Sequence, residues 1–180
     1  MRRELGGDFL VIEEGLNGRT TVWDDPLVPG RNGKEYLVPC LNSHRPLDFV
    51  VLFLGTNDLK KRFSASAQDI AQGVGVLAGI VASSAAGPRG GSPVTLILAP
   101  PPLGKLTGYG ETFENSAATS VKLGARIREI ALELNCEFLD TSELIATSDI
   151  DGVHFDPSAH EVLGCAVARR IMMLSRPNHA

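Results

Sequence analysis

The stretch FVVLFLGTND at residues 49–58 decides the fold class of this chain. Six apolar residues stand in a row, and a glycine and three polar residues follow them directly. A short, unbroken apolar run is typical of a strand in a parallel sheet that is covered on both faces. The polar residues follow the carboxyl end of that strand, which is the edge where open α/β sheets bind their ligands.

Similar apolar runs predict further strands at residues 9–12, 94–99 and 137–139. Apolar residues at helical spacing lie between and after these runs, which predicts amphipathic helices there. Strands that alternate with helices form βαβ units with right-handed crossovers, so we expect an α/β fold with a parallel sheet. The helical stripes consist of Ile70, Val74, Leu77 and Val81, then Leu123, Ile127, Ile130 and Leu134, then Leu163, Val167, Ile171 and Leu174.

Capping residues indicate where two of these helices begin. Ser66 and Asp69 have the spacing of a capping box just ahead of the first stripe. Asp156 followed by Pro157 predicts an N-cap and a first turn for the last helix. A shorter helix is predicted over residues 34–41.

The composition is that of one ordinary globular domain over residues 1–180. The formal net charge is −4, so there is no basic surplus to neutralise phosphates, which argues against a nucleic-acid partner. The basic run at residues 60–62 is interpreted as a solvated loop or helix edge. No apolar run is long enough to span a bilayer, and no secretory signal follows Arg2 and Arg3. We therefore expect a cytoplasmic chain with no membrane partner.

The cysteines do not form a recognisable framework. Cys40, Cys136 and Cys165 are odd in number and widely spaced, so we expect buried, reduced thiols and neither a disulfide framework nor a zinc ribbon. The acidic and histidine residues near the C-terminus fit no metal-ligand spacing, and we expect no metal.

Three polar segments are candidates for chemistry. Asn57 offers a side-chain NH₂ donor to an oxyanion, and Asp58 can hold its loop by accepting backbone N–H bonds. Gly18 follows the first predicted strand, and its backbone N–H can approach a ligand closely. Asp151 can bond Nδ1 of His154, which leaves Nε2 as a general base. Taken singly, each segment is better interpreted as an ordinary turn.

Together, the three segments resemble the SGNH (GDSL) hydrolase family. That family has a Gly-Asp-Ser block, a glycine block, a Gly-x-Asn-Asp block and an Asp-x-x-His block. Gly18 matches the second block, residues 55–58 the third and residues 151–154 the fourth, in the family's order. The similarity to the family's arylesterase-like branch covers nearly the whole chain and lies in residues 13–16, 19–21, 24–26, 52–60 and 100–103. The resemblance implies a flavodoxin-like, three-layer α/β/α sandwich.

The resemblance also implies a mechanism by acyl transfer. A serine attacks an ester carbonyl while His154, oriented by Asp151, takes the proton. The oxyanion accepts bonds from the Gly18 N–H and the Asn57 side chain, with Asp58 as support. No cofactor is implied, and the implied substrates are small esters with short acyl chains on aryl or simple alkyl groups. The sequence leaves open whether the chain forms a homo-oligomer.

The family's Gly-Asp-Ser block is not found in residues 1–180. The one Gly-Asp pair, Gly7-Asp8, is followed by Phe9 and precedes the second family strand. We therefore expect an N-terminally truncated domain, without the first strand and helix and without the nucleophile, that is inactive and poorly stable. The remaining candidates by residue type are interpreted as structural: Ser43, Ser64, Ser66 and Ser142.

Two other functions remain open at this point. The first is a pseudo-enzyme or binding module that keeps the sandwich without catalysis. The second is a flavodoxin-like nucleotide-binding module, which is disfavoured because no glycine-rich phosphate loop opens a helix in this sequence.

Overall fold

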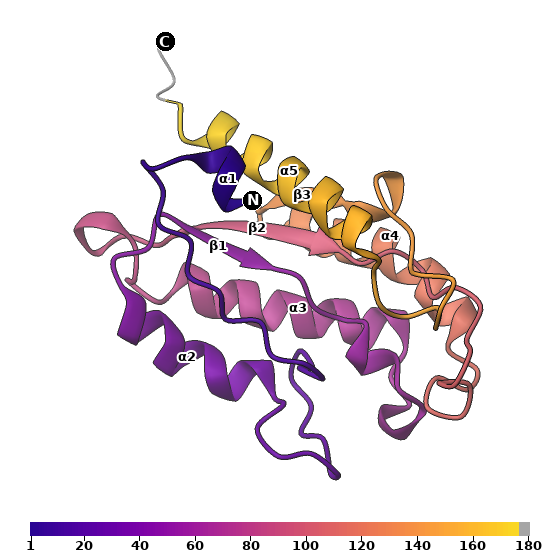
Figure 1. The fold of residues 1–180 in the computed structure, drawn as a ribbon. Coiled ribbons are helices and arrows are strands. Elements are labelled where there is room, and N and C mark those ends of the chain that lie inside the picture. Colours follow the sequence, from indigo (N-terminus) through magenta and orange to yellow (C-terminus); the bar gives the residue numbers. More distant parts are fainter. Residues whose placement is uncertain (177–180) are drawn as a thin grey trace.

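The computed structural model describes residues 1–176. Its sheet contains three parallel strands in the order β1–β2–β3, and Figure 1 shows helices on both sides of it. The strands are β1 (Phe49–Leu52), β2 (Val94–Ala99) and β3 (Glu137–Asp140). The helices are α1 (Arg2–Leu5), α2 (Gly33–His44), α3 (Ala67–Ala82), α4 (Ala117–Glu133) and α5 (Pro157–Leu174). Short 3₁₀ helices lie at Asn57–Leu59, Lys61–Phe63, Pro88–Gly90 and Thr141–Glu143.

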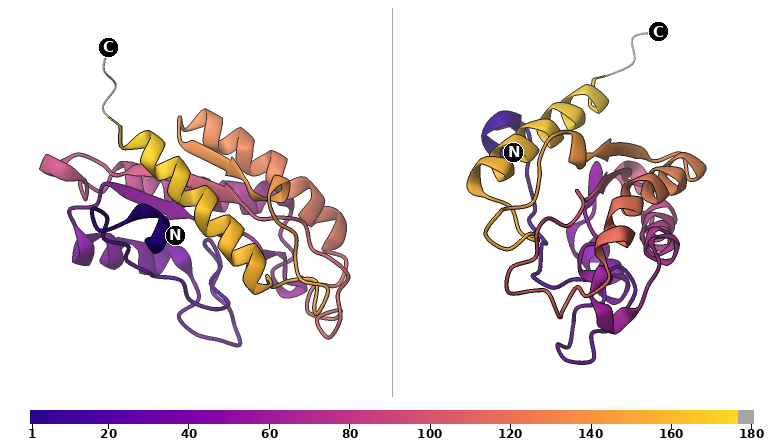
Figure 2. Two further views of the ribbon diagram at one scale, coloured as in Figure 1. Left: turned by 45° about the horizontal axis from the view of Figure 1, so that its top comes forward. Right: turned by 90° about the vertical axis from the view of Figure 1, so that its right-hand side faces the viewer.

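The elements form three layers. Helices α3 and α4 cover one face of the sheet, α1 and α5 cover the other, and α2 packs beside α3 (Figures 1 and 2). The side chains of β2 alternate between the two resulting cores: Ile97 packs with α3 and α4, and Leu98 packs with α5. Both are almost fully buried, as predicted for a strand in a sheet covered on both sides. The α/β/α architecture with a parallel sheet is therefore confirmed.

The helix boundaries follow local chemistry. The Ser66 side chain accepts from the Asp69 N–H, and the Asp69 carboxylate accepts from the Ser66 N–H, so the predicted capping box is formed. The last helix begins at Pro157 as expected, but the Asp156 side chain makes no cap bond. It accepts instead from the Ser148 hydroxyl at 2.7 Å, which ties the preceding loop to the start of the helix.

The predicted strand at residues 9–12 is wrong. This segment is neither helix nor strand, although Phe9 and Val11 pack against the α5 side of the sheet and Leu10 is 88% exposed. Within residues 1–176, no backbone N–H of the segment donates a hydrogen bond to the protein. Strand-like alternation is therefore present, but no neighbouring strand lies within reach to complete a ladder.

No helix among residues 1–176 is both long enough and apolar enough to cross a bilayer.

Candidate active site

The loop ahead of α5 holds Asp151 and His154 as a bonded pair. Nδ1 of His154 lies 2.7 Å from Oδ2 of Asp151. The other carboxylate oxygen accepts from the backbone N–H groups of Val153 at 2.8 Å and His154 at 2.9 Å. The two backbone bonds and the His154 side chain lower the pKa of Asp151 to about 2. The carboxylate thus stays ionised and holds the imidazole with Nδ1 toward it.

The rest of the imidazole is accessible. The His154 side chain is 58% exposed, and among the described residues Nε2 has no hydrogen-bond partner. The Tyr109 ring lies 5.8 Å from it, centroid to centroid, so the loop after β2 reaches the same place. Phe155 stacks on Phe53 at 6.0 Å, which fixes the His154 loop to the end of β1. A free Nε2 in this position can accept a proton from a hydroxyl group.

The turn after β1 is held by Asp58. This residue is fully buried, and its Oδ1 accepts from the Thr21 N–H at 2.9 Å and from the Thr21 hydroxyl. Burial raises the pKa of Asp58 to about 6, although the two bonds from Thr21 act in the opposite direction. Asp58 therefore joins the turn after β1 to the loop that contains Gly18. Its neighbour Asn57 makes no side-chain hydrogen bond within the described part of the chain, so its NH₂ group is available to a ligand.

Gly18 sits in a turn that only glycine adopts easily. Its φ is +79°, and an added Cβ would lie 3.3 Å from Nε of Arg31 and 3.8 Å from Nζ of Lys60. Positive φ is unfavourable for residues with a Cβ, so glycine is the residue that suits this turn.

Gly18, Asn57 and His154 line a single cavity of about 1170 Å³. Three segments that are far apart in the sequence thus bring a glycine N–H, an amide donor and an oriented imidazole to one opening. This set can stabilise an oxyanion and move a proton. The four serines considered above do not line this cavity, and their hydroxyls donate to nearby acceptors at Pro39, Lys61, Asp69 and Asp140.

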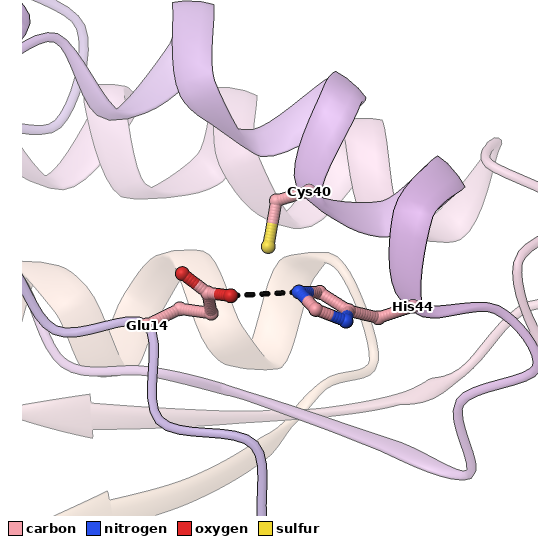
Figure 3. A group of neighbouring side chains, drawn as sticks. All are labelled: Glu14, Cys40 and His44. Carbon is pink, nitrogen blue, oxygen red and sulfur yellow. Dashed lines mark hydrogen bonds and ion pairs between the residues drawn. The ribbon is translucent and has the colours of Figure 1, made fainter.

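A second group of ionisable side chains lies on the α2 side of the cavity (Figure 3). Glu14, Cys40 and His44 each bring one potential metal ligand within 4.8 Å of the others. The Glu14 carboxylate is already bonded to Nε2 of His44 at 2.7 Å and to the Tyr36 hydroxyl. Burial raises the pKa of Cys40, which keeps it a thiol, whereas metals bind the thiolate. The group is therefore best described as a hydrogen-bonded network that fastens residue 14 to α2.

Sequence reasoning missed Arg19. Its side chain is only 9% exposed and its guanidinium stacks 4.1 Å from the Tyr36 ring centroid. Its Nε and Nη1 are buried without a hydrogen-bond partner among the described residues. The local sequence does not indicate that the Arg19 side chain is buried, because its burial depends on α2 packing beside it.

The basic run at residues 60–62 lies at the surface as predicted, since Lys61 and Arg62 are exposed, but it also forms ion pairs that the sequence did not indicate. Arg62 and Lys60 lie 2.9 and 3.9 Å from Oδ1 and Oδ2 of the buried Asp25, and Lys61 pairs with Glu114. The run therefore also holds the loop at residues 24–26 in place.

Comparisons with known proteins show which family this chain is similar to. The model of the GDSL-like lipase/acylhydrolase family matches residues 1–162. The aryl esterase of M. smegmatis is 38% identical and superposes with a TM-score of 0.91 over 96% of this chain and 82% of the esterase. A carbohydrate acetylesterase from Sinorhizobium meliloti is 36% identical, with a TM-score of 0.92 over 96% of this chain and 82% of that protein.

Among curated proteins, no sequence matches the chain. The family match spans both the Gly18 turn and the Asp151–His154 loop, and the structural likeness extends over nearly every described residue. This chain belongs to the GDSL-like lipase/acylhydrolase family.

Proposed function

We propose that this site hydrolyses carboxylic esters through an acyl-enzyme. His154 accepts the proton of a serine nucleophile at Nε2, and Asp151 holds the imidazole and stabilises its charged form. The Gly18 N–H and the Asn57 NH₂ group bind the oxyanion of the tetrahedral intermediate. Asp58 is a positioning residue, because it joins the two loops that carry those donors. The observation that carries the proposal is that Gly18, Asn57 and His154 share one cavity.

The proposed nucleophile is the serine of a Gly-Asp-Ser block that residues 1–180 do not contain. The residues present supply a base, its orienting acid and two oxyanion donors. The two serines that line the cavity, Ser92 and Ser175, come before β2 and after α5, and their hydroxyls donate to the carbonyls of Ala82 and Ile171. We therefore infer that residues 1–180 alone are catalytically silent. The inferred order of events is attack by that serine, release of the alcohol, and hydrolysis of the acyl group with His154 acting as base again.

The proposed substrates are small esters with short acyl groups, such as acetyl, on aryl or simple alkyl alcohols. Support comes from two similar proteins, one named an aryl esterase and the other a carbohydrate acetylesterase. The inferred mechanism requires no cofactor, since proton transfer and oxyanion binding are both assigned to side-chain and backbone groups. The cytoplasmic location and the homo-oligomer remain predictions.

A second candidate is a non-catalytic binding protein that retains the sandwich. The absence of the Gly-Asp-Ser block favours it. The hydrogen-bonded Asp151–His154 pair and the available Asn57 amide favour catalysis. A protein that only binds a ligand does not need an oriented imidazole base.

The two candidates can be separated with a joined protein. In this protein a designed strand, a Gly-Asp-Ser turn and a helix precede Met1 of residues 1–180. We expect it to hydrolyse p-nitrophenyl acetate, with loss of activity when the serine is replaced by alanine or when His154→Ala is made. Arg126→Gln, on the exposed face of α4, is the matched control and should leave the rate unchanged. A folded joined protein without serine-dependent hydrolysis would support the binding protein.

A further inference from the structure

Ser148 is the hydrogen-bonding centre of the loop that carries Asp151 and His154. Its N–H donates to the His154 carbonyl at 2.7 Å, and its carbonyl accepts from the Gly152 N–H at 2.8 Å. Its hydroxyl accepts from the Ile150 N–H at 3.2 Å. The residue itself is only 6% exposed. Positions 150, 152 and 154 of the loop are thus all bonded to one buried residue.

These bonds fix the curvature of the loop on both sides of Asp151. The Asp151 carboxylate has to reach the ring of His154 three residues later, and Oδ2 and Nδ1 lie 2.7 Å apart. Ser148 holds the backbone at Ile150 and Gly152, the two neighbours of Asp151, and at His154 itself. A change in this curvature would move Nδ1 relative to Oδ2, and a hydrogen bond weakens steeply when its geometry worsens.

The other side of the loop is held by the segment that follows β2. The Gly104 N–H donates to the Gly152 carbonyl at 2.8 Å, and the Thr107 N–H donates to the Asp151 carbonyl at 3.3 Å. These bonds attach the first half of the loop to the end of the sheet. Among the described residues, Ser148 is the one that bonds both this half and the His154 backbone.

The Ser148 hydroxyl also draws Asp156 away from the helix that follows. Asp156 is the N-cap residue of α5, and its φ of −69° and ψ of 158° are the extended conformation usual for a cap. Its side chain nevertheless makes no cap bond and accepts from the Ser148 hydroxyl at 2.7 Å. A capping aspartate accepts from the second or third N–H of its helix, which here belong to Ser158 and Ala159. The helix therefore lacks a stabilising bond that the loop ahead of it has gained.

We propose that Ser148 is a positioning residue for the Asp151–His154 pair, and that it keeps Asp156 off the cap of α5 in order to hold the loop. This inference rests on the proposed function and adds to it a residue outside the Asp-x-x-His motif. Ser148 does not line the cavity, so it acts through the pair and not on the substrate. Helix stability is exchanged for a fixed imidazole, which is a common relationship between stability and activity.

The orientation of the imidazole is tested by NMR on residues 1–180 and on the joined protein, each labelled with ¹⁵N-histidine. In the parent, Nδ1 of His154 should carry the proton of the neutral ring, and this proton should exchange slowly with water because Asp151 accepts it. In the Ser148→Ala variant we expect roughly tenfold faster exchange and population of the other tautomer, because the hydrogen bond to Asp151 is weakened. Ser148→Thr keeps the hydroxyl and should restore the parent signals.

A second measurement separates positioning from ordinary structural support. Without the Ser148 hydroxyl, Asp156 is free to cap α5, so the amides of Ser158 and Ala159 should exchange more slowly in the Ser148→Ala variant. The urea midpoint should stay close to that of the parent, because one bond is lost and another is formed. A markedly lower midpoint without protection of these two amides would show that Ser148 only supports the fold, and would overturn the proposal.

Ser84→Ala is the matched control. The Ser84 hydroxyl also accepts from the N–H two residues later, at 3.2 Å, and it donates to the Val81 carbonyl at 2.8 Å, but it lies after α3 and does not line the cavity. This variant should leave the His154 signals unchanged. Equal loosening of the imidazole in the Ser84→Ala and Ser148→Ala variants would overturn the proposal.

Kinetics of the joined protein complete the test. Ser148→Ala should lower kcat for p-nitrophenyl acetate roughly tenfold with little change in KM, because only the orientation of the base is lost. A joined protein that hydrolyses no ester, but whose imidazole is fixed in the parent and loosened in the Ser148→Ala variant, would sustain the positioning role and refute the esterase. Imidazole signals in the Ser148→Ala variant that equal those of the parent would refute the positioning role, whatever the activity of the joined protein.

Discussion

Nδ1 of His154 lies 2.7 Å from Oδ2 of Asp151, and the other oxygen of the same carboxylate accepts two backbone N–H groups. The aspartate is thus anchored by its own loop before it holds the imidazole. Because these bonds lower the pKa of Asp151 to about 2, the carboxylate remains charged at every pH at which an esterase is usually assayed.

The first prediction concerns this pair. In the joined protein, His154→Ala should lower the turnover of p-nitrophenyl acetate by on the order of 10⁶, because triad members act as a unit. Asp151→Asn should cost about 10⁴ by favouring the wrong imidazole tautomer. Arg126→Gln, on the exposed face of α4, is the control and should leave the turnover unchanged. A fully active His154→Ala variant would refute the assignment.

Asn57→Ala tests the oxyanion assignment. We expect kcat to fall by roughly 10²–10³ with little change in KM, because the bond from the amide strengthens in the transition state. Steady-state kinetics of the joined protein give the two parameters separately. If only KM rises, Asn57 binds the ground state and the oxyanion role is wrong.

Gly18→Ala tests the backbone donor against a matched glycine. Gly18 and Gly90 have φ values of +79° and +77°, so alanine at either position should cost about 1–2 kcal/mol of stability. Only at Gly18 would the new Cβ meet other atoms, including Nε of Arg31 at 3.3 Å. The resulting shift of the turn should lower kcat roughly tenfold to a hundredfold. Equal activity of the Gly18→Ala and Gly90→Ala variants would argue against an oxyanion donor at Gly18.

Asp58 should make stability depend on pH in a defined window. Its folded pKa, about 6, is above the ordinary value of 3.8, mainly because burial disfavours the charge. As the pH rises, the unfolded chain releases this proton first, so the free energy of unfolding falls between about pH 4 and pH 7. In an Asp58→Asn variant this contribution, up to about 3 kcal/mol, should be absent. Urea unfolding of both joined proteins at pH 4 and pH 7 measures it, and parallel pH profiles would contradict it.

Much of the fold was predictable because the signals are local. The mainly apolar run of β2 and the stripes of α3, α4 and α5 reflect burial on one or two faces, so they can be read from the local sequence. The segment at residues 9–12 was mispredicted for the opposite reason. Its side chains do alternate between partly buried and exposed positions, as in a strand. A strand also needs a neighbouring strand for its backbone hydrogen bonds, and whether one is present depends on the tertiary structure.

The residues of the candidate site also fall into those that the local sequence indicates and those that it does not. Gly18, Asn57, Asp58, Asp151 and His154 could be named from short motifs, because each motif is a loop that follows a strand or precedes a helix. Arg19 and the pairing of Arg62 with Asp25 could not, since both depend on burial by segments distant in the sequence. The side chain of Asp156 was assigned to a helix cap, yet Ser148 bonds it, and nothing in the sequence distinguishes these two partners.

We infer that residues 1–180 carry the base and the oxyanion donors but not the nucleophile. Labelling with a fluorophosphonate, followed by mass-spectrometric mapping of the modified residue, tests this most directly. We expect no label on residues 1–180 alone, and stoichiometric label on the Gly-Asp-Ser serine of the joined protein that disappears in the His154→Ala variant. Stoichiometric labelling of any serine within residues 1–180, accompanied by ester hydrolysis from that chain alone, would contradict the claim.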